Sequence, residues 1–285
     1  MKIAFISDTH FGGKELTGFQ MQPRYVEHEH ELCSALGEMI RKEKIDLLIH
    51  GGDMCEEGDA GQIRMVSELF GKYVKIPMVM ALGNHDCLQP DCGNLWLTNA
   101  PNFFPQNSLD TTFIYDNFRI DILSLHWGYD GLQWKIPDGQ KTHMTEEQWT
   151  RLRSGRQDLP RIIAMHSQLR AAMPERTGLD EPRMVPANNF AAVGDALIKE
   201  FSPVLILSGH SHINLQDRLE DTAAVVVSSF SETPFDCKIV EITDEKITMK
   251  TVSLVDTVDF KAEFNKENLF VMGDASVREF SKELK

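Results

Sequence analysis

The sequence lacks the features of a membrane-spanning, disulfide-stabilised or polyanion-binding protein. No apolar run approaches the roughly 20 residues needed to cross a bilayer, and its start, MKIAFISD, reads as a strand, not a secretion signal. The five cysteines are an odd number, which favours free thiols in a reducing, cytoplasmic setting. Positive charge is scarce, with 29 Lys and Arg against 43 Asp and Glu and a net charge of −14. Because binding to a phosphate backbone depends largely on Lys and Arg, a nonspecific nucleic-acid binder is not expected.

Internal repeats, low-complexity segments and Pro- or Gly-rich linkers are also missing. The 285 residues are enough for one large α/β domain, a size that such folds often reach without splitting. Clear periodicity is lost from about Asp256 onward. We therefore predict a single domain over residues 1–255 and a C-terminal extension or tail over 256–285, ending in a short amphipathic helix or a frayed segment.

Five apolar runs each end in side chains that bind metal ions. Runs of Val, Ile, Leu and Met bounded by Gly and polar residues are typical of strands buried on both faces. Sites in open α/β sheets form beyond the carboxyl ends of such strands, so we expect the ligands to gather at one edge of a sheet. Carboxylate, imidazole and amide oxygen suit divalent metals, and the donors are too many for one ion, which favours a two-metal centre. The runs are KIAFISDTH with Asp8 and His10, DLLIHGGD with Asp53, PMVMALGNHD with Asn84, His85 and Asp86, RIIAMHS with His166, and PVLILSGHSH with His210 and His212.

In order, D-x-H, G-D, G-N-H-D, an isolated His and G-H-x-H resemble the motifs of the calcineurin-like metallophosphoesterase superfamily, from Asp8 to His212. The resemblance implies an α/β fold, the four-layer α/β/β/α sandwich of that superfamily, and a metal-dependent phosphoester hydrolase. It also implies that Asp53 bridges two ions, and a carboxylate suits this role because both its oxygens have spare lone pairs. The implied ligands are Asp8, His10 and His212 for one ion and Asn84, His166 and His210 for the other.

The same resemblance gives the third motif a catalytic role. His85 would face the substrate and protonate the leaving oxygen or stabilise the charged transition state. Asp86 would accept a hydrogen bond from the other His85 nitrogen and fix its tautomer. The nucleophile would be a metal-bound hydroxide. Mn, Fe and Zn all accept mixed His and carboxylate sites, so two divalent ions are expected without an assigned identity.

Residues beside the proposed ligands have structural interpretations. Gly52, Gly83 and Gly209 each stand immediately before a ligand, where we expect the chain to turn sharply and its backbone to approach the ions closely. His50 lies three residues before Asp53, and strand alternation points it to the opposite face. We therefore expect His50 to be a hydrogen-bonded core residue.

Helical patterns separate the strands, as a layered fold requires. We predict helices within residues 26–45, 61–74, 144–157 and 188–201, and Thr145 and Gln148 have capping-box spacing at the start of the third. The runs at 223–230, 237–244 and 246–254 read as strands of a second sheet that closes the sandwich.

Three long connections, over residues 87–111, 127–145 and 167–188, leave strand ends that carry or border the proposed ligands. Loops of this length commonly serve a site. Arginines in the third connection could bind a phosphate, but we favour the interpretation that they are ordinary surface residues. Most aromatic rings in the first two connections should hold these loops on the core. A zinc clip is conceivable in the first connection, although ordinary thiols are expected, and a histidine before the second either packs or borders the site. The arginines are Arg170, Arg176 and Arg183, and the aromatic residues are Trp96, Phe103, Phe104, Trp127 and Trp134. The thiols of the conceivable zinc clip are Cys87 and Cys92, and the histidine is His126.

The motif details narrow the substrate. Residues 52–58 depart from the G-D-x-V-D-R-G signature of the superfamily's phosphoprotein phosphatases, and the third motif ends in Asp86 instead of Glu, so a Ser/Thr protein phosphatase is not expected. We predict a phosphodiesterase acting on a small or nucleotide phosphoester substrate. One alternative is an Mre11/SbcD-like DNA exonuclease, favoured by the opening Asp8 to Gly12 and GNHD but opposed by the acidic charge. The other is a catalytically inactive metal-binding scaffold, opposed by the intact motif set. Oligomeric state stays open.

Overall fold

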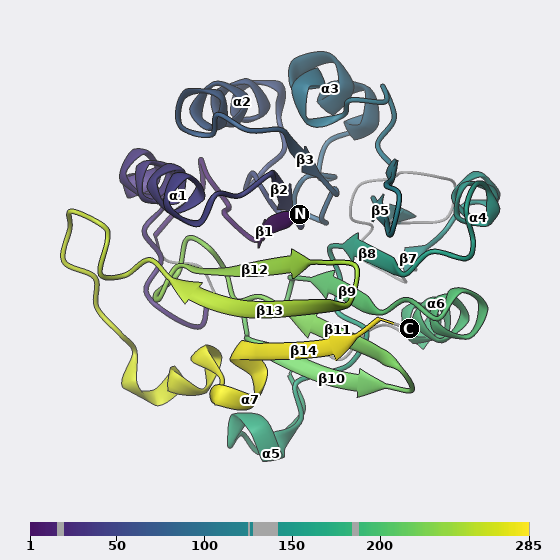
Figure 1. The fold of residues 1–285 in the computed structure, drawn as a ribbon. Coiled ribbons are helices and arrows are strands. Elements are labelled where there is room, and N and C mark those ends of the chain that lie inside the picture. The colour runs from purple at the N-terminus through teal and green to yellow at the C-terminus, as the bar shows by residue number, and fades with distance from the viewer. Residues whose placement is uncertain (16–19, 125, 128–141, 184–187, 285) are drawn as a thin grey trace.

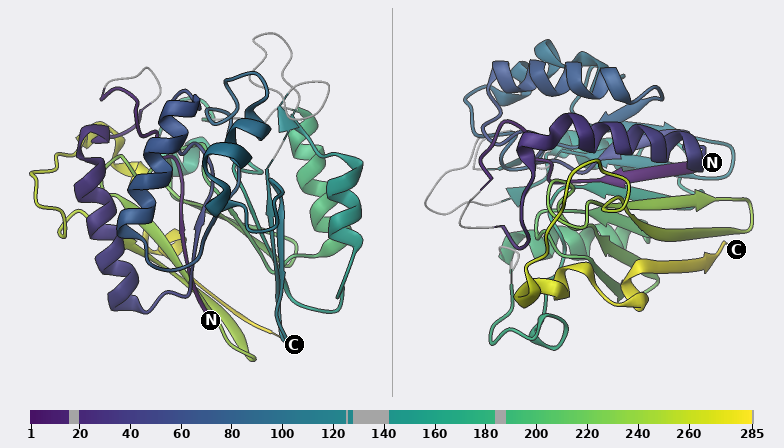
Figure 2. Two further views of the ribbon diagram at one scale, coloured as in Figure 1. Left: turned by 90° about the horizontal axis from the view of Figure 1, so that it is seen from above. Right: turned by 90° about the vertical axis from the view of Figure 1, so that its left-hand side faces the viewer.

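Two six-stranded sheets pack face to face between two layers of helices (Figures 1 and 2). The computed structural model describes residues 1–15, 20–124, 126–127, 142–183 and 188–284. This mixed α/β architecture is the predicted four-layer sandwich. None of the helices over the described residues is long and apolar enough to span a bilayer.

The first sheet has the order β14-β13-β12-β1-β2-β3. Its three parallel strands β1, β2 and β3 are the first three apolar runs, and β12 pairs antiparallel with the other edge of β1, with Ile3 opposite Val240. We expected the runs at 237–244 and 246–254 in the second sheet. They form β12 and β13 of the first sheet instead, because either sheet would bury such a run and the local pattern does not choose between them. The strands are β1 (Lys2–Ile6), β2 (Leu47–His50), β3 (Met78–Met80), β12 (Asp236–Ile242), β13 (Lys246–Ser253) and β14 (Glu279–Glu283).

The second sheet has the order β10-β11-β9-β8-β5-β4. Its centre is formed by the parallel strands β11, β9, β8 and β5, and the run at 223–230 joins it as β11, as expected. The strands are β4 (Thr111–Ile114), β5 (Arg119–Leu123), β8 (Arg161–Met165), β9 (Leu205–Ser208), β10 (Leu215–Leu219) and β11 (Thr222–Val226), beside a separate pair of β6 (His126–Trp127) and β7 (Thr142–His143).

The helices form where the apolar spacing predicts them and cover the outer faces of the sheets (Figure 2). Thr145 and Gln148 make the predicted capping box. On the first sheet lie α1 (Glu29–Glu43), α2 (Ala60–Tyr73) and α3 (Cys92–Asn99), and on the second α4 (Glu146–Arg153) and α6 (Asn188–Phe201). Short elements are η1 (Val26–His28), η2 (Pro101–Phe103), α5 (Pro174–Thr177), η3 (Lys266–Met272) and α7 (Ala275–Arg278).

Alternation along β1 divides the apolar core into layers. Ala4 and Ile6 pack with the helices of the first sheet, whereas Ile3 and Phe5 face the second sheet. A third cluster joins the second sheet to α4 and α6. The ends of the strands are thereby held in fixed relative positions, which a multi-residue site requires.

The connection over residues 87–111 folds as α3 and η2 and packs on the core of the first sheet. Its rings Trp96, Phe103 and Phe104 are buried, as predicted for rings that hold the connection down. The side chains of His126 and Trp127, and the whole of Trp134, lie outside the described residues, so the predictions for them stay predictions.

Residues after 255 pack against both sheets. The predicted terminal helix is limited to α7, and the chain then forms β14, which pairs antiparallel with β13. The division into a domain over 1–255 and an extension over 256–285 stays a prediction.

Candidate metal centre

All seven predicted ligands lie beyond the carboxyl ends of parallel strands, but they come from both sheets. Asp8 and His10 follow β1, Asp53 follows β2, and Asn84 follows β3. His166 follows β8, and the pair at 210 and 212 follows β9. Our expectation of one sheet edge was wrong, because the two packed sheets bring the carboxyl ends of their strands together.

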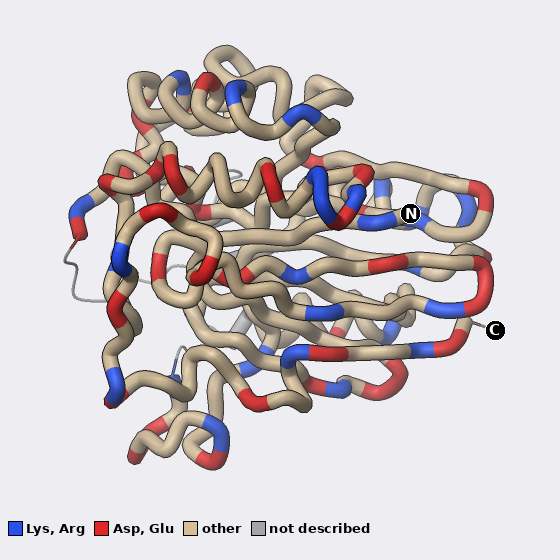
Figure 3. Tube along the Cα trace, turned by 60° about the vertical axis from the view of Figure 1, so that its left-hand side comes forward, with Lys and Arg blue, Asp and Glu red and all other residues tan. Residues whose placement is uncertain are grey.

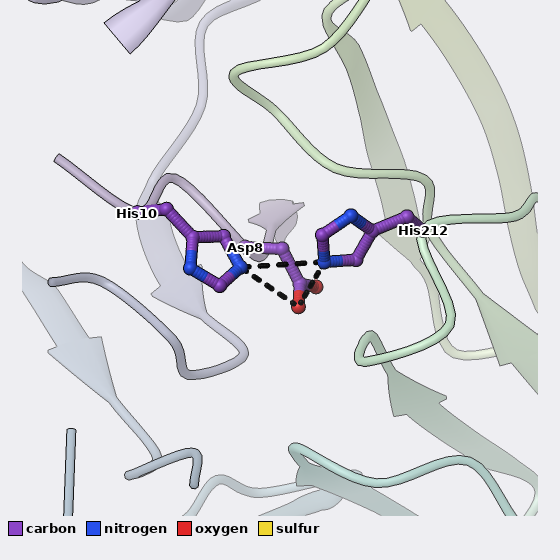
Figure 4. Close-up of side chains that lie close together, drawn as sticks. All are labelled: Asp8, His10 and His212. Carbon is purple, nitrogen blue, oxygen red and sulfur yellow. Dashed lines mark hydrogen bonds and ion pairs between the residues drawn. The ribbon is translucent and has the colours of Figure 1, made fainter. Parts of the chain in front are cut away.

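The first ligand group consists of Asp8, His10 and His212, whose donor atoms all lie within 4.8 Å of one another. His212 Nε2 is 3.3 Å from Asp8 Oδ1 and 3.3 Å from His10 Nε2, and the three side chains point toward a common centre (Figure 4). All three are buried. One carboxylate and two imidazoles in this arrangement suit a borderline divalent ion.

The second group contains Asp53, His166 and His210. His166 Nε2 lies 3.1 Å from Asp53 Oδ2 and 3.1 Å from His210 Nδ1. The neighbouring Asn84 Oδ1 is buried and makes no hydrogen bond with the described residues. An unsatisfied buried amide oxygen is costly, by about 1–3 kcal/mol, unless it binds something else. This atom therefore fits a metal ligand.

Asp53 lies between the two groups. Its Oδ2 is 3.1 Å from His166 Nε2 and 3.9 Å from His10 Nε2, so the same oxygen faces an imidazole of each group. Its Oδ1 accepts a hydrogen bond from the backbone N–H of His85, at 2.8 Å. The geometry suits the predicted bridging carboxylate.

The second nitrogen of three of these imidazoles faces an oxygen, in hydrogen bonds for His166 and His212 and in an ion-pair contact for His10. His166 Nδ1 lies 2.9 Å from the carbonyl oxygen of Gly51. His212 Nδ1 is 2.8 Å from Glu232 Oε1, and His10 Nδ1 is 3.0 Å from Glu56 Oε2. Such partners fix the ring orientation and direct Nε2 toward an ion.

Sequence reasoning missed both of these glutamates. Glu56 lies three residues after Asp53 in the same motif loop, so its position offered a weak signal. Glu232 lies outside every motif, in SSFSETPFD, and only the folded chain brings it to the site.

Five ligands have left-handed backbone conformations, which are uncommon for residues other than glycine. Each costs on the order of 1–3 kcal/mol and persists only when the surroundings enforce it. Hydrogen bonds from Asp8 N to Gly52 O and from His10 N to Asp53 O, both 3.0 Å, fix part of this backbone. The ligands with their φ values are Asp8 (58°), His10 (48°), Asp53 (52°), His210 (71°) and His212 (58°).

The backbone of Gly83 and Gly209 lies close to the proposed ligands, whereas its predicted approach to the ions stays a prediction. A Cβ on Gly83 would lie 2.2 Å from Asp53 Oδ1, and one on Gly209 would lie 2.1 Å from Ser7 Oγ and 2.3 Å from Asp8 Oδ2. Gly52 additionally has a φ of +101°, which provides the predicted sharp turn.

Burial and the carboxylates act in opposite directions on the imidazoles. Burial lowers the pKa of His210 to about 3. Burial also acts to lower the pKa of His212, but Glu232 and Asp8 outweigh it and raise that pKa to about 10. For His166, Asp53 likewise outweighs burial and raises the pKa to about 9. Protons therefore compete with metal ions at His166 and His212.

His85 and Asp86 do not make the hydrogen bond that we predicted. His85 Nδ1 lies 2.8 Å from the carbonyl oxygen of Glu56, which can only accept a hydrogen bond. The buried Asp86 carboxylate accepts backbone N–H groups of Gly83, Met54 and Cys55 instead. Burial, followed by the charge of Asp53, raises the pKa of Asp86 to about 7. Asp86 thus joins the loops after β2 and β3, because adjacent side chains in this turn point in different directions.

The remaining candidates have structural partners. His50 is buried and lies 3.1 Å from both Thr9 Oγ1 and the Gly52 N–H, as predicted for a core histidine. Neither Cys87 nor Cys92 belongs to a ligand group of the described residues, and both are buried free thiols. The three arginines of the third connection bind elsewhere: Arg170 to Asp195, Arg176 to Asp217, and Arg183 to Met21 Sδ.

Comparisons with known proteins agree with this fold. A family model described as calcineurin-like phosphoesterase matches residues 1–214, which include every proposed ligand. None of the curated proteins matches the chain. Among solved structures, a dimetal phosphatase from Danio rerio has 14% identity and a TM-score of 0.69, covering 92% of this chain and 98% of its own.

Two further structures are similar. A purple acid phosphatase from yellow lupin (Lupinus luteus) seeds has 15% identity and a TM-score of 0.56, with 98% of this chain but 53% of that one covered. GAP50, the anchor in the inner membrane complex of Plasmodium, has 14% identity and a TM-score of 0.59, and the match covers 93% of this chain and 89% of that chain. At these identities the similarity shows the fold alone.

Proposed function

Because this chain belongs to the calcineurin-like phosphoesterase family and is a phosphoester hydrolase, we propose that it is a two-metal phosphodiesterase acting on a small or nucleotide substrate. The observation that carries the proposal is that three possible ligand groups adjoin one another around Asp53: Asp8, His10 and His212; His10, Asp53 and His85; and Asp53, His166 and His210. The same fold serves as an anchor in Plasmodium GAP50, so the fold alone does not determine activity. Here the ligand groups are intact.

The ligands divide as the motifs imply. Asp8, His10 and His212 would hold one ion, and His166, His210 and the unsatisfied Asn84 oxygen would hold the other. When bound, two divalent ions supply Lewis acidity at the phosphoryl oxygens and lower the pKa of an attacking water. Asp53 would fix the spacing between the two positions.

His85 is the residue placed to act on the leaving group. Its ring centroid lies 4.7 Å from that of His10, and its backbone N–H holds Asp53. Because the carbonyl of Glu56 only accepts, Nδ1 of His85 must carry a proton. Nε2 is then the nitrogen that gains and loses the exchangeable proton, and the side chain is 24% exposed, enough to contact a substrate. We assign it the role of general acid.

The charge distribution favours a diester over a monoester. A monoester dianion needs more positive charge than a diester monoanion, and the protein has a net charge of −14. Arg170 and Arg176 form ion pairs with Asp195 and Asp217 rather than lining the site. Acidic and basic residues are also interspersed over the described chain (Figure 3), which gives little support to binding of a long polyanion.

The state of the cysteines supports the expected reducing, cytoplasmic compartment. All five cysteines are buried and free, which fits a reducing compartment such as the cytoplasm.

A substrate panel tests the proposal. The protein, stripped of metal and reloaded with Mn²⁺, Zn²⁺ or Fe²⁺, is assayed for kcat/KM on bis-p-nitrophenyl phosphate, p-nitrophenyl phosphate, linear and cyclic nucleotides and single-stranded DNA. We expect diester turnover to exceed monoester turnover, with Asp53→Asn as the inactive control. Faster monoester hydrolysis would overturn the diester assignment, and faster DNA degradation would favour the exonuclease. Absence of hydrolysis on every substrate would favour the scaffold.

A further inference from the structure

A single buried arginine connects the two imidazoles of the first ligand group. Arg24 is 4% exposed. Its Nη1 lies 3.3 Å from Glu56 Oε2, and its Nη2 lies 3.3 Å from Glu232 Oε1. These are the same oxygens that lie 3.0 Å from Nδ1 of His10, as an ion-pair contact outside hydrogen-bond geometry, and 2.8 Å from Nδ1 of His212, in a hydrogen bond. The guanidinium therefore spans both carboxylate–imidazole pairs.

The second group is built differently. In this group the Nδ1 of His166 lies 2.9 Å from a neutral acceptor, the backbone carbonyl of Gly51. A carboxylate partner raises the basicity of an imidazole ligand more than a neutral carbonyl does. The two groups should thus differ in affinity for the same ion.

Arginine suits this position for a geometric reason. Its planar fork presents separate N–H groups to two acceptors, whereas a lysine ammonium is a single point charge. Glu232 is 1% exposed, and a carboxylate at that depth is costly unless its charge is balanced and its oxygens are satisfied. Arg24 balances it from one side and His212 from the other.

The segment that carries Arg24 is itself fixed. The backbone N–H groups of Met21 and Gln22 both donate to Glu232 Oε2, at 3.0 Å. Gln22 Nε2 donates to the carbonyls of Asn265 and Asn268, at 3.0 and 2.8 Å. Asn265 and Asn268 thereby hold the segment against the metal centre, which positions the guanidinium.

From this arrangement we propose that Arg24 is a positioning residue for the first metal site. By fixing Glu56 and Glu232 it orients His10 and His212 and makes the site of Asp8, His10 and His212 the tighter of the two. The inference rests on the proposed two-metal function.

Calorimetric titration of the metal-free protein with Mn²⁺ tests it. The wild type should bind two ions in two affinity classes, and Asp8→Asn should remove the tighter class. Arg24→Met should weaken that class by about 10–100-fold and leave the other class unchanged. Arg24→Lys, which keeps the charge but not the fork, should show a smaller loss in the same class. Arg170→Met is the matched control, because Arg170 pairs with Asp195 at the surface, and both classes should be retained.

Thermal unfolding and circular dichroism of each metal-free variant establish that it is folded. If Arg24→Met does not fold, Arg24→Lys supplies the same comparison. Two unchanged classes in the folded Arg24 variants would overturn the inference and leave the two-metal function standing, and so would equal weakening of both classes. A wild type that binds no ion would overturn the proposed function itself.

Discussion

The metal centre and the cluster around Asp236 are both buried and polar, but they differ in how far the protein satisfies their hydrogen-bonding groups. Asp236 is fully buried and accepts hydrogen bonds from Asn214 Nδ2 at 2.6 Å, Ser253 Oγ at 2.5 Å and Arg278 Nη1 at 3.0 Å. Lys238 Nζ donates to Thr251 Oγ1 at 2.8 Å and to the Val277 carbonyl at 3.3 Å. This cluster is satisfied by the protein alone and ties α7 to β12 and β13.

In the metal centre, the protein does not satisfy every hydrogen-bonding group. Asn84 Oδ1 has no partner among the described residues, and imidazole nitrogens approach one another at 3.1 and 3.3 Å. Five of its residues also have left-handed backbone. A polar cluster that serves stability is complete by itself, whereas one that serves binding stays incomplete until its ligand arrives. Four predictions test this difference.

The largest effect is expected at the bridge. Asp53→Asn keeps the shape of the side chain but removes the charge that faces both groups, so turnover should fall below detection and bound metal below two ions per chain. Elemental analysis measures the metal, and circular dichroism should show a retained fold. Two ions still bound to the variant would remove Asp53 from the bridging role.

The second-largest effect is expected at His85, where a substitution should slow the chemical step without changing metal binding. His85→Ala should keep both ions and lose about 10²- to 10⁴-fold in rate on an ester with a poor leaving group. A p-nitrophenyl ester should lose much less, because its leaving group needs little protonation. Steady-state kinetics on both esters measures this, and equal losses would indicate substrate binding or charge stabilisation instead.

Asp86→Asn provides the comparison for His85. Its carboxylate holds backbone N–H groups of both motif loops, so the substitution should lower stability without leaving-group selectivity. Loss of metal in His85→Ala would instead mean that His85 is itself a ligand.

The third prediction concerns the satisfied cluster. Arg278→Met removes the ion-pair partner of the buried Asp236 carboxylate and should lower the free energy of unfolding by roughly 3 kcal/mol. Metal stoichiometry of the folded variant should not change. Urea unfolding measures the loss, and Arg218→Met, whose ion pair with Asp221 is exposed, should change stability by less than about 0.5 kcal/mol. Impaired metal binding in Arg278→Met would show that the two clusters are coupled.

The smallest effect is a pH dependence of the same cluster. Burial lowers the pKa of Lys238 from 10.5 to about 7, against the attraction of Asp236 and together with the repulsion of Arg278. Between these values Lys238 binds more protons in the unfolded chain than in the folded protein, so its contribution to the free energy of unfolding rises with pH, whereas the contributions of His166 and His212, whose pKa values are raised by folding, fall. The gain from pH 7 to 8 is expected to be about 1 kcal/mol. Urea unfolding of the wild type and of Lys238→Met at both pH values measures this contribution as the difference between the two proteins, and an identical pH dependence of both would contradict it.

Many ligands of the metal centre could be predicted, because they follow apolar runs that would form buried strands in any α/β sheet. Asp8, Asp53 and His166 each end such a run, and the glycines before ligands mark where the backbone must approach. The capping box at Thr145 is equally local. The partner of His85 could not be predicted in the same way, since the direction of a side chain in a strained turn depends on what packs around it.

The sequence by itself determined which residues turn, alternate and end the strands, because these properties depend on neighbours a few positions away. Only the tertiary structure decided that the ligands come from two sheets and that β12 and β13 extend the first. It alone brought Arg24 and Glu232, 208 positions apart, to the imidazoles of the first group. An apolar run gains similar burial in either sheet, so its local pattern does not specify which distant side chains will meet.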